Sequence, residues 1–366
     1  MLITDSVRDF AVVRRRCRRL LRSNVPLTPL ARYVGELICV RPGGYRIARE
    51  LDRGARSPDR LTAMMALALR AGIRENAGDP RGSLRDSERA YRMRIVEHVW
   101  GTAMVRQHLG QLAAQSGHYS DAVDHYRAAV DALHRLRAYD ESLEIRSYLA
   151  MSMVGSGEYE QARRQLEFAN RFVDGGPDDP VSHPNHRRAV LACGWSELAL
   201  ACGDIDTGLR RGRAALASAA WPSRNPDFGP VDTILACQVL DAHILYGGLD
   251  AVPELPRQLM RIALERLSQF QDLPLLGMVA ITVGSYLLAS GGPTETGCEL
   301  FALAERVAAR QDSPSMNLAR HLVQHRPVID AEATAAAQHR VVGLGRRRAA
   351  ERILKLVGSV HERIRR

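Results

Sequence analysis

From Leu109 the chain reads LGQLAAQSGHYSDAVDHYRAA, and forty residues later, from Leu149, it reads LAMSMVGSGEYEQARRQLEFA. When the two stretches are aligned in one register, seven pairs of positions carry the same or a similar residue: Leu109/Leu149, Gly110/Ala150, Gly117/Gly157, Tyr119/Tyr159, Ala122/Ala162, Tyr126/Leu166 and Ala129/Ala169. Self-similarity at a fixed period is the signature of an array of structural units, each of which buries its apolar face against its neighbours.

Each matched position has a physical role in a hairpin of two helices. A small residue at 110 or 150 lets the two helices approach closely, and the alanine twelve residues later lies where they cross. The glycine at 117 or 157 ends the first helix because it accepts a positive φ, and the following tyrosine packs across the turn. The larger residue at 126 or 166 fills the space to the next hairpin. This pattern of L-G/A, then G-x-Y, then A-x3-F/Y/L-x2-A resembles the tetratricopeptide repeat (TPR).

Weaker copies of the pattern flank these two repeats. Their turns are predicted at Gly78, Gly203, Gly247 and Gly292. No segment alternates apolar and polar residues with a period of two, so strands are not expected. We therefore predict an all-α protein, a right-handed α-solenoid of about six TPR-like helical hairpins with flanking terminal helices.

The net charge of +10 is concentrated at the two ends of the chain. Residues 1–60 carry 14 basic and 6 acidic side chains, and residues 331–366 carry 9 basic and 3 acidic ones. Acidic residues slightly outnumber basic ones in between. We divide the chain into a basic N-terminal helical segment at 1–60, the solenoid at 61–312, and a basic C-terminal helical segment at 313–366.

Composition excludes several classes of protein. An apolar fraction of 46% with 25% charged residues is typical of a globular chain. The longest apolar runs, such as Leu275–Ile281, are too short to span a bilayer. Arginines stand in the first 25 residues where a secretory signal needs its apolar stretch, and the six cysteines form no CxxC pair. We expect a cytoplasmic protein without a membrane association.

The sequence offers no motif for catalysis or for a cofactor. It lacks GxSxG, GxxxxGK[ST], HExxH, and a GxGxxG that opens a βαβ unit. His321 and His325 lie four residues apart on a predicted helix, which is a spacing for a metal pair. They have no acidic or thiol ligand beside them, so we interpret them as surface histidines. We expect no enzyme, no metal and no cofactor.

The concave face of a TPR array is lined by the first helix of each hairpin. The positions predicted to face this groove carry amide, acid, hydroxyl and thioether groups: Met104, Gln107, Gln111, Gln115, Glu144, Ser147, Met151 and Glu197. Such a mixture suits an extended peptide or a helix of a partner protein. For any single position the alternative is a solvated wall. We predict a protein or peptide partner in the groove, and a homo-oligomer also stays open.

A cluster of arginines near the N-terminus supports a second hypothesis. It lies in a stretch whose apolar residues keep helical spacing, and its members are Arg14, Arg15, Arg16, Arg18 and Arg19. Such a helix can contact phosphates of a nucleic acid, or it can cap the solenoid with its arginines in water. The absence of interleaved aromatic residues favours the cap. The alternative function is therefore a DNA-binding transcriptional regulator that uses its basic terminal segments.

A second resemblance covers about residues 61–320. The stretches QFQDLPLLG at 269–277, LFALAER at 300–306 and SPSM at 313–316 resemble the C-terminal end of the AfsR-like regulators, of the actinobacterial Streptomyces antibiotic regulatory protein (SARP) class. In that class a winged-helix domain, a bacterial transcriptional activation domain and a nucleotide-binding module precede a TPR region. This chain has no Walker A motif. The resemblance implies a sensor or partner-binding arm that acts in bacterial transcriptional or signalling control.

Overall fold

The computed structural model describes residues 7–39, 44–93, 98–173, 185–222, 231–270 and 272–365. Within these ranges the secondary structure is helical, with eighteen α-helices and no strand. No helix in these ranges is both long and apolar enough to cross a membrane. The predicted all-α class is therefore confirmed.

Twelve of these helices form six successive hairpins. Within each hairpin the two helices pack against each other, and successive hairpins stack. The pairs are α4 (Arg60–Asn76) with α5 (Pro80–Arg92), α6 (Val99–Gln115) with α7 (Tyr119–Arg135), α8 (Tyr139–Gly155) with α9 (Tyr159–Asn170), α10 (His186–Ala201) with α11 (Ile205–Ser218), α12 (Val231–Tyr246) with α13 (Leu255–Phe270), and α14 (Leu273–Ala289) with α15 (Thr294–Arg306). The α-solenoid of about six hairpins is thus confirmed.

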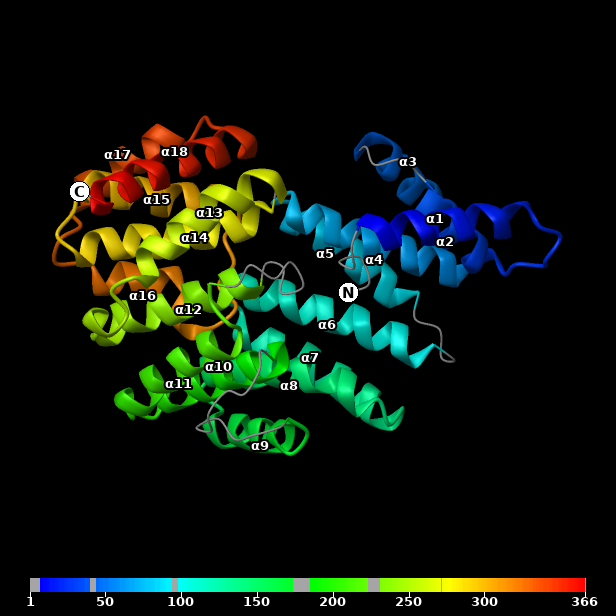
Figure 1. The fold of residues 1–366 in the computed structure, drawn as a ribbon, viewed down its shortest axis with the longest axis horizontal. Helices are drawn as coiled ribbons and strands as arrows, with labels where there is room; N and C mark the ends of the chain where they lie inside the picture. The colour runs from blue at the N-terminus through cyan, green and yellow to red at the C-terminus, as the bar shows by residue number, and fades with distance from the viewer. Residues whose placement is uncertain are drawn as a thin grey trace.

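Shorter groups of helices flank the hairpins at both ends. The N-terminal group comprises α1 (Val7–Arg22), α2 (Pro29–Cys39) and α3 (Gly44–Gly54), of which α3 packs on α4. The C-terminal group comprises α16 (Leu318–Gln324), α17 (Ala331–Val341) and α18 (Arg346–Arg365), and α17 and α18 cover α13, α14 and α15. Figure 1 shows α1–α3, in blue, at the opposite end of the molecule from α17 and α18.

The residues that define the repeat take the roles that the sequence predicts for them. Gly117 and Gly157 have φ of 73° and 84°, in the left-handed region that follows a helix. A Cβ on Gly110 would lie 2.9 Å from the ring of Tyr126, so glycine permits the close approach of α6 and α7. Leu166 is fully buried and fills the space between its hairpin and α10.

Two glycines allow these roles to be tested with opposite expected signs. Gly157→Ala should lower the free energy of unfolding by about 1 kcal/mol, because a Cβ at this left-handed position is strained although no atom lies within 4 Å of it. Gly72→Ala should raise it by about 0.5–1 kcal/mol, because Gly72 lies inside α4 with open space around its Cβ position. Urea denaturation measures both values. A stabilised Gly157→Ala variant would contradict the assigned turn.

The last hairpin of the solenoid returns to the first. Helix α14 packs against α4, and a Cβ on Gly78 would lie 3.1 Å from the carbonyl oxygen of Val307. Arg346 of α18 lies 3.8 Å from Asp79 across the same junction. Because the array closes in this way, its inner face is enclosed by its own helices.

Candidate functional site

The connection between α15 and α16 runs through the inside of the molecule. Connecting segments normally lie on the surface, because buried loops strand polar backbone groups. Here five consecutive residues, Asp312–Met316, are buried. The 3-10 turn η3 (Pro314–Met316) packs against α8, α12, α14 and α16. Helices α8, α12 and α14 are first helices of hairpins, so residues 310–317, here called the inner segment, lie on the inner face.

Side chains and backbone of the solenoid bind the backbone of the inner segment. The hydroxyl of Tyr119, at the start of α7, lies 2.9 Å from the carbonyl oxygens of both Gln311 and Ser313. The backbone N–H of Arg310 donates to the carbonyl oxygen of Pro274 at 3.2 Å. Each of these bonds recognises main chain, and none depends on the side chain of the residue that is bound.

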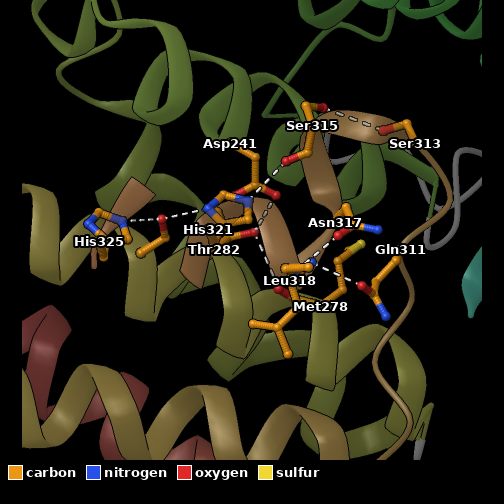
Figure 2. Close-up of polar contacts among 12 residues, drawn as sticks. Asp241, Met278, Thr282, Gln311, Ser313, Ser315, Asn317, Leu318, His321 and His325 are labelled. Carbon is orange, nitrogen blue, oxygen red and sulfur yellow. Dashed lines mark hydrogen bonds and ion pairs between the residues drawn. The ribbon is translucent and has the colours of Figure 1, made fainter. Parts of the chain in front are cut away.

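His321 anchors the same segment from α16. Its Nε2 lies 2.9 Å from the carbonyl oxygen of Ser315, which can only accept, so Nε2 carries the proton. Its Nδ1 then accepts from the hydroxyl of Ser285 at 2.7 Å, and that hydroxyl in turn accepts from Nε2 of His325 at 2.7 Å. Figure 2 shows this chain of contacts from His325 to the inner segment.

The interpretation of His321 and His325 as surface residues is wrong. Their exposed fractions are 0% and 5%, whereas Val323 on the same helix is 72% exposed. The physical reason is that α16 packs on the polar side of α12 and α14, where Ser285 and the inner segment provide hydrogen-bond partners. The helix therefore turns its histidines inward and an apolar side chain outward.

Ser285, His321 and Asp241 have the composition of a hydrolase triad but lie closed to solvent. Nε2 of His321 is 3.7 Å from Oδ1 of Asp241, whose Oδ2 accepts from the hydroxyl of Thr282 at 3.1 Å. Burial raises the pKa of Asp241 well above its ordinary value. All three groups are buried, so a substrate has no access to the serine in this arrangement.

Acid should weaken the fold through His321. Burial lowers the pKa of His321 to about 3; the hydrogen bond to the Ser315 carbonyl opposes this shift, and His325 and Arg320 add to it. Since the ordinary pKa of histidine is about 6.5, the unfolded chain binds a proton between pH 6.5 and 3 that the folded chain does not bind. Stability is therefore fully present above pH 6.5 and is lost as the pH falls.

The measurement is urea denaturation at pH 7 and pH 5 for the wild type and for His321→Gln. The wild type should lose about 2 kcal/mol more than the variant over this interval, since each unit of unequal protonation contributes about 1.4 kcal/mol. Other histidines whose pKa is lowered, such as His108 and His243, are present in both proteins and cancel in the difference. Equal losses in the two proteins would show that His321 is not held neutral.

Glu197 of α10 holds the centre of the inner segment. It is buried, and its carboxylate accepts from the hydroxyl of Ser315 and from Nε2 of Gln238 at 2.9 Å. The same amide nitrogen of Gln238 lies 3.7 Å from the sulfur of Met151. Burial raises the pKa of Glu197, and its hydrogen bonds oppose that shift. The hydroxyl of Ser315 and the amide of Gln238 donate to the same carboxylate oxygen, Oε1 of Glu197, so the inner segment supplies one of the two hydrogen bonds to this oxygen.

Arg310 supplies a cation at the other end of the inner segment. Its guanidinium binds Asp312 at 2.7 Å. Burial would lower the pKa of Arg310, but Asp312, Glu75 and Asp272 outweigh it and raise that pKa. Glu75 of α4 is itself buried, and it accepts hydrogen bonds from the amides of Gln111 and Gln115.

The structure brings part of the predicted groove residues into this polar interior. Gln111, Gln115, Met151 and Glu197 make the contacts described above. The other four lie on the same first helices, where Met104, Gln107 and Glu144 are half-buried and Ser147 is buried. The carboxylate of Glu144 accepts from the hydroxyl of Tyr148 at 3.1 Å, and Ser147 donates to the carbonyl of Leu143 in its own helix.

The sequence did not predict several residues of this polar interior: Glu75, Gln238, Asp241, Arg310 and Ser315. It predicted that Tyr119 packs across a turn, but not that its hydroxyl donates hydrogen bonds to the inner segment. The SPSM stretch at 313–316 was the one available signal for the inner segment, since it resembles a family sequence outside the repeat pattern.

The arginine cluster lies on α1, away from the polar interior. Arg14 is half-buried and donates to the carbonyl oxygen of Cys39 at 3.2 Å, whereas its four companions Arg15, Arg16, Arg18 and Arg19 are exposed. A surface cavity of about 860 Å³ lies nearby between α2, α3 and α4. In its wall Arg53 is paired with Glu36 at 2.6 Å. The cavity is separate from the inner segment.

Comparison with known proteins identifies the fold. No family model matches the chain, and no curated protein matches it in sequence. Among solved structures, the chain is similar to a Rap protein in the crystal structure of its complex with competence and sporulation factor. The two share 12% sequence identity with a TM-score of 0.60, over 95% of this chain and 99% of the other. The chain therefore has a TPR-like helical-repeat fold.

Proposed function

We propose that this protein is a TPR-type binding module whose inner face takes up a peptide, or an extended segment of a partner protein, in bacterial transcriptional or signalling control. One observation carries the proposal. The inner face already binds eight residues of its own chain, which include the turn η3, through main-chain carbonyls, a buried carboxylate and a cation-binding end. A surface that recognises backbone in this way has the chemistry of a peptide-binding site.

Two likenesses support this proposal. The Rap protein of the same fold was crystallised with competence and sporulation factor, which is a precedent for ligand binding by this architecture. The resemblance to AfsR-like regulators favours a role in regulation within the cytoplasm. We further propose that the protein acts by binding and not as an enzyme, because Ser285 and His321 are closed to solvent and His321 holds the inner segment.

The groove is tested by the double variant Gln111→Ala/Glu144→Ala. It should reduce capture of the partner from lysate of the native host about tenfold or more, since two polar contacts of about 1 kcal/mol each are lost. The matched control is Glu160→Ala/Gln161→Ala on the outer helix α9, where both side chains are exposed. Circular dichroism verifies that both proteins remain folded. Equal capture by both variants would remove the groove as the binding site.

The alternative function is a nucleic-acid-binding regulator that uses the basic terminal segments. Arg15, Arg16, Arg18 and Arg19 favour it because they are exposed on one helix. If this function is correct, the protein should retard DNA in a gel-shift assay, and the retardation should fall steeply as the salt concentration rises. Replacing the four arginines by alanine should abolish the retardation. A full-length protein that retards no DNA at low salt would eliminate this function.

A further inference from the structure

The inner segment uses the groups that a ligand on the inner face would need. The hydroxyl of Tyr119 lies within hydrogen-bond distance of the carbonyl oxygens of Gln311 and Ser313. The carboxylate of Glu197 accepts from the hydroxyl of Ser315, and Nε2 of His321 donates to the carbonyl oxygen of Ser315. Asp312–Met316 are buried between first helices of the hairpins. A peptide from outside therefore cannot reach these groups while the inner segment is in place.

The inner segment is mostly polar. It reads Arg-Gln-Asp-Ser-Pro-Ser-Met-Asn, and only Pro314 and Met316 bring apolar side chains. Polar groups exchange bonds with protein for bonds with water at little net change, so such a segment leaves the interior more easily than an apolar one. Just before it, Ala308 has a φ of 58° in the left-handed turn that ends α15, where the N–H of Ala309 donates to the carbonyl oxygen of Ala304.

Removal of the inner segment would leave an acidic surface. Glu75 and Asp272 would lose Arg310 as a partner, and Glu197 would lose the hydroxyl of Ser315. The distances along the segment define what could replace it. An occupant must offer a guanidinium or ammonium near Glu75 and, five residues further on, a hydroxyl near Glu197.

We propose that the inner segment is an internal ligand of the inner face, and that an external peptide of the same chemistry binds by displacing it. This inference rests on the proposed function. The external peptide carries a cationic side chain toward its N-terminal end and a hydroxyl residue about five positions later, and it accepts hydrogen bonds from the face mainly through its backbone carbonyls.

The principal test replaces residues 310–317 by an eight-residue Gly-Ser linker in the full chain. The probe is a fluorescein-labelled peptide of residues 309–318, and its anisotropy is measured with each protein. The linker variant should bind this peptide at least tenfold more tightly than the wild type does. The control peptide has Arg310→Ala and Ser315→Ala, and it should bind more weakly than the parent. A folded linker variant that does not bind the probe, or equal binding by the wild type, would overturn the proposal.

If the linker variant fails to fold, a milder pair of variants decides the question. Tyr119→Phe removes the hydroxyl on the segment but keeps the ring, which packs against Gly155 of α8. Tyr159→Phe is the matched control, because Tyr159 holds the equivalent repeat position but is exposed. Hydrogen exchange of the amides at 311–317 should accelerate about fivefold in Tyr119→Phe and stay unchanged in Tyr159→Phe. Unchanged exchange in both would overturn the proposal.

The outcomes separate this inference from the proposed function. If capture of the partner depends on Gln111 and Glu144 while the linker variant binds the peptide no more tightly than the wild type, the inner face is the binding site. In that case the proposal that the inner segment is its internal ligand is wrong. If the linker variant binds the probe while Gln111→Ala/Glu144→Ala leaves capture unaffected, the inner segment is a ligand of the inner face but the partner binds elsewhere.

Discussion

Replacing Arg310 by alanine should release the inner segment from the interior without unfolding the hairpins. The guanidinium is the cation that Asp312, Glu75 and Asp272 share. Removing one partner of a buried charge pair typically costs about 3–5 kcal/mol, because the remaining charge is left uncompensated. The segment can avoid this cost by moving into water, where Asp312 is hydrated. Its local opening should therefore become more favourable by a comparable amount.

The measurement is hydrogen exchange followed by mass spectrometry. Amides of residues 311–317 should exchange about a hundredfold faster or more in Arg310→Ala, since each 1.4 kcal/mol is a factor of ten. Amides of α6, α8 and α10 should keep their protection. The control is Arg306→Ala, four residues earlier, whose exposed side chain donates to the carbonyl of Leu344. Global unfolding of Arg310→Ala would show that the segment is part of the core and not a separable occupant.

Leu166→Ala should produce the largest loss of global stability. Leu166 is fully buried, and a Cβ on Gly194 would lie 2.7 Å from its side chain, so it fills the space between its hairpin and α10. Truncation of a buried leucine removes its transfer free energy and leaves a cavity, which together cost about 2–5 kcal/mol. In a repeat array each hairpin is stabilised by its neighbours, so a defect at this interface weakens both.

Thermal and urea unfolding of Leu166→Ala should show this loss, and the Leu136→Ala variant is the control. Leu136 follows α7 and is 44% exposed, so its truncation should change stability by less than about 1 kcal/mol. A loss of the same small size in both variants would mean that position 166 does not carry the contact between hairpins that the repeat register assigns to it.

The repeat itself could be predicted from the sequence because its signals are local. The positive φ of Gly117 and Gly157 and the packing of Tyr126 on Gly110 involve residues within one hairpin. Such contacts leave a regular spacing in the sequence.

The polar interior could not be predicted in the same way, because it is assembled over long distances in the chain. Tyr119 meets residues almost two hundred positions later, and Ser315 meets Glu197. Helices α12 and α14 are apolar on most faces, so hydropathy does not show which side meets the inner segment. His321 and His325 were misplaced because a polar residue on a helix is assigned to the solvent unless a buried partner is known.

The most direct measurement on the intact protein is hydrogen exchange across the whole chain, with and without the partner purified from the native host. If the inner face is the binding site, the partner should slow exchange in α6, α8 and α10 and should accelerate it in residues 310–317, which it displaces. Protection confined to α1 or to the outer helices α7, α9 and α11, with residues 310–317 unchanged, would contradict the account.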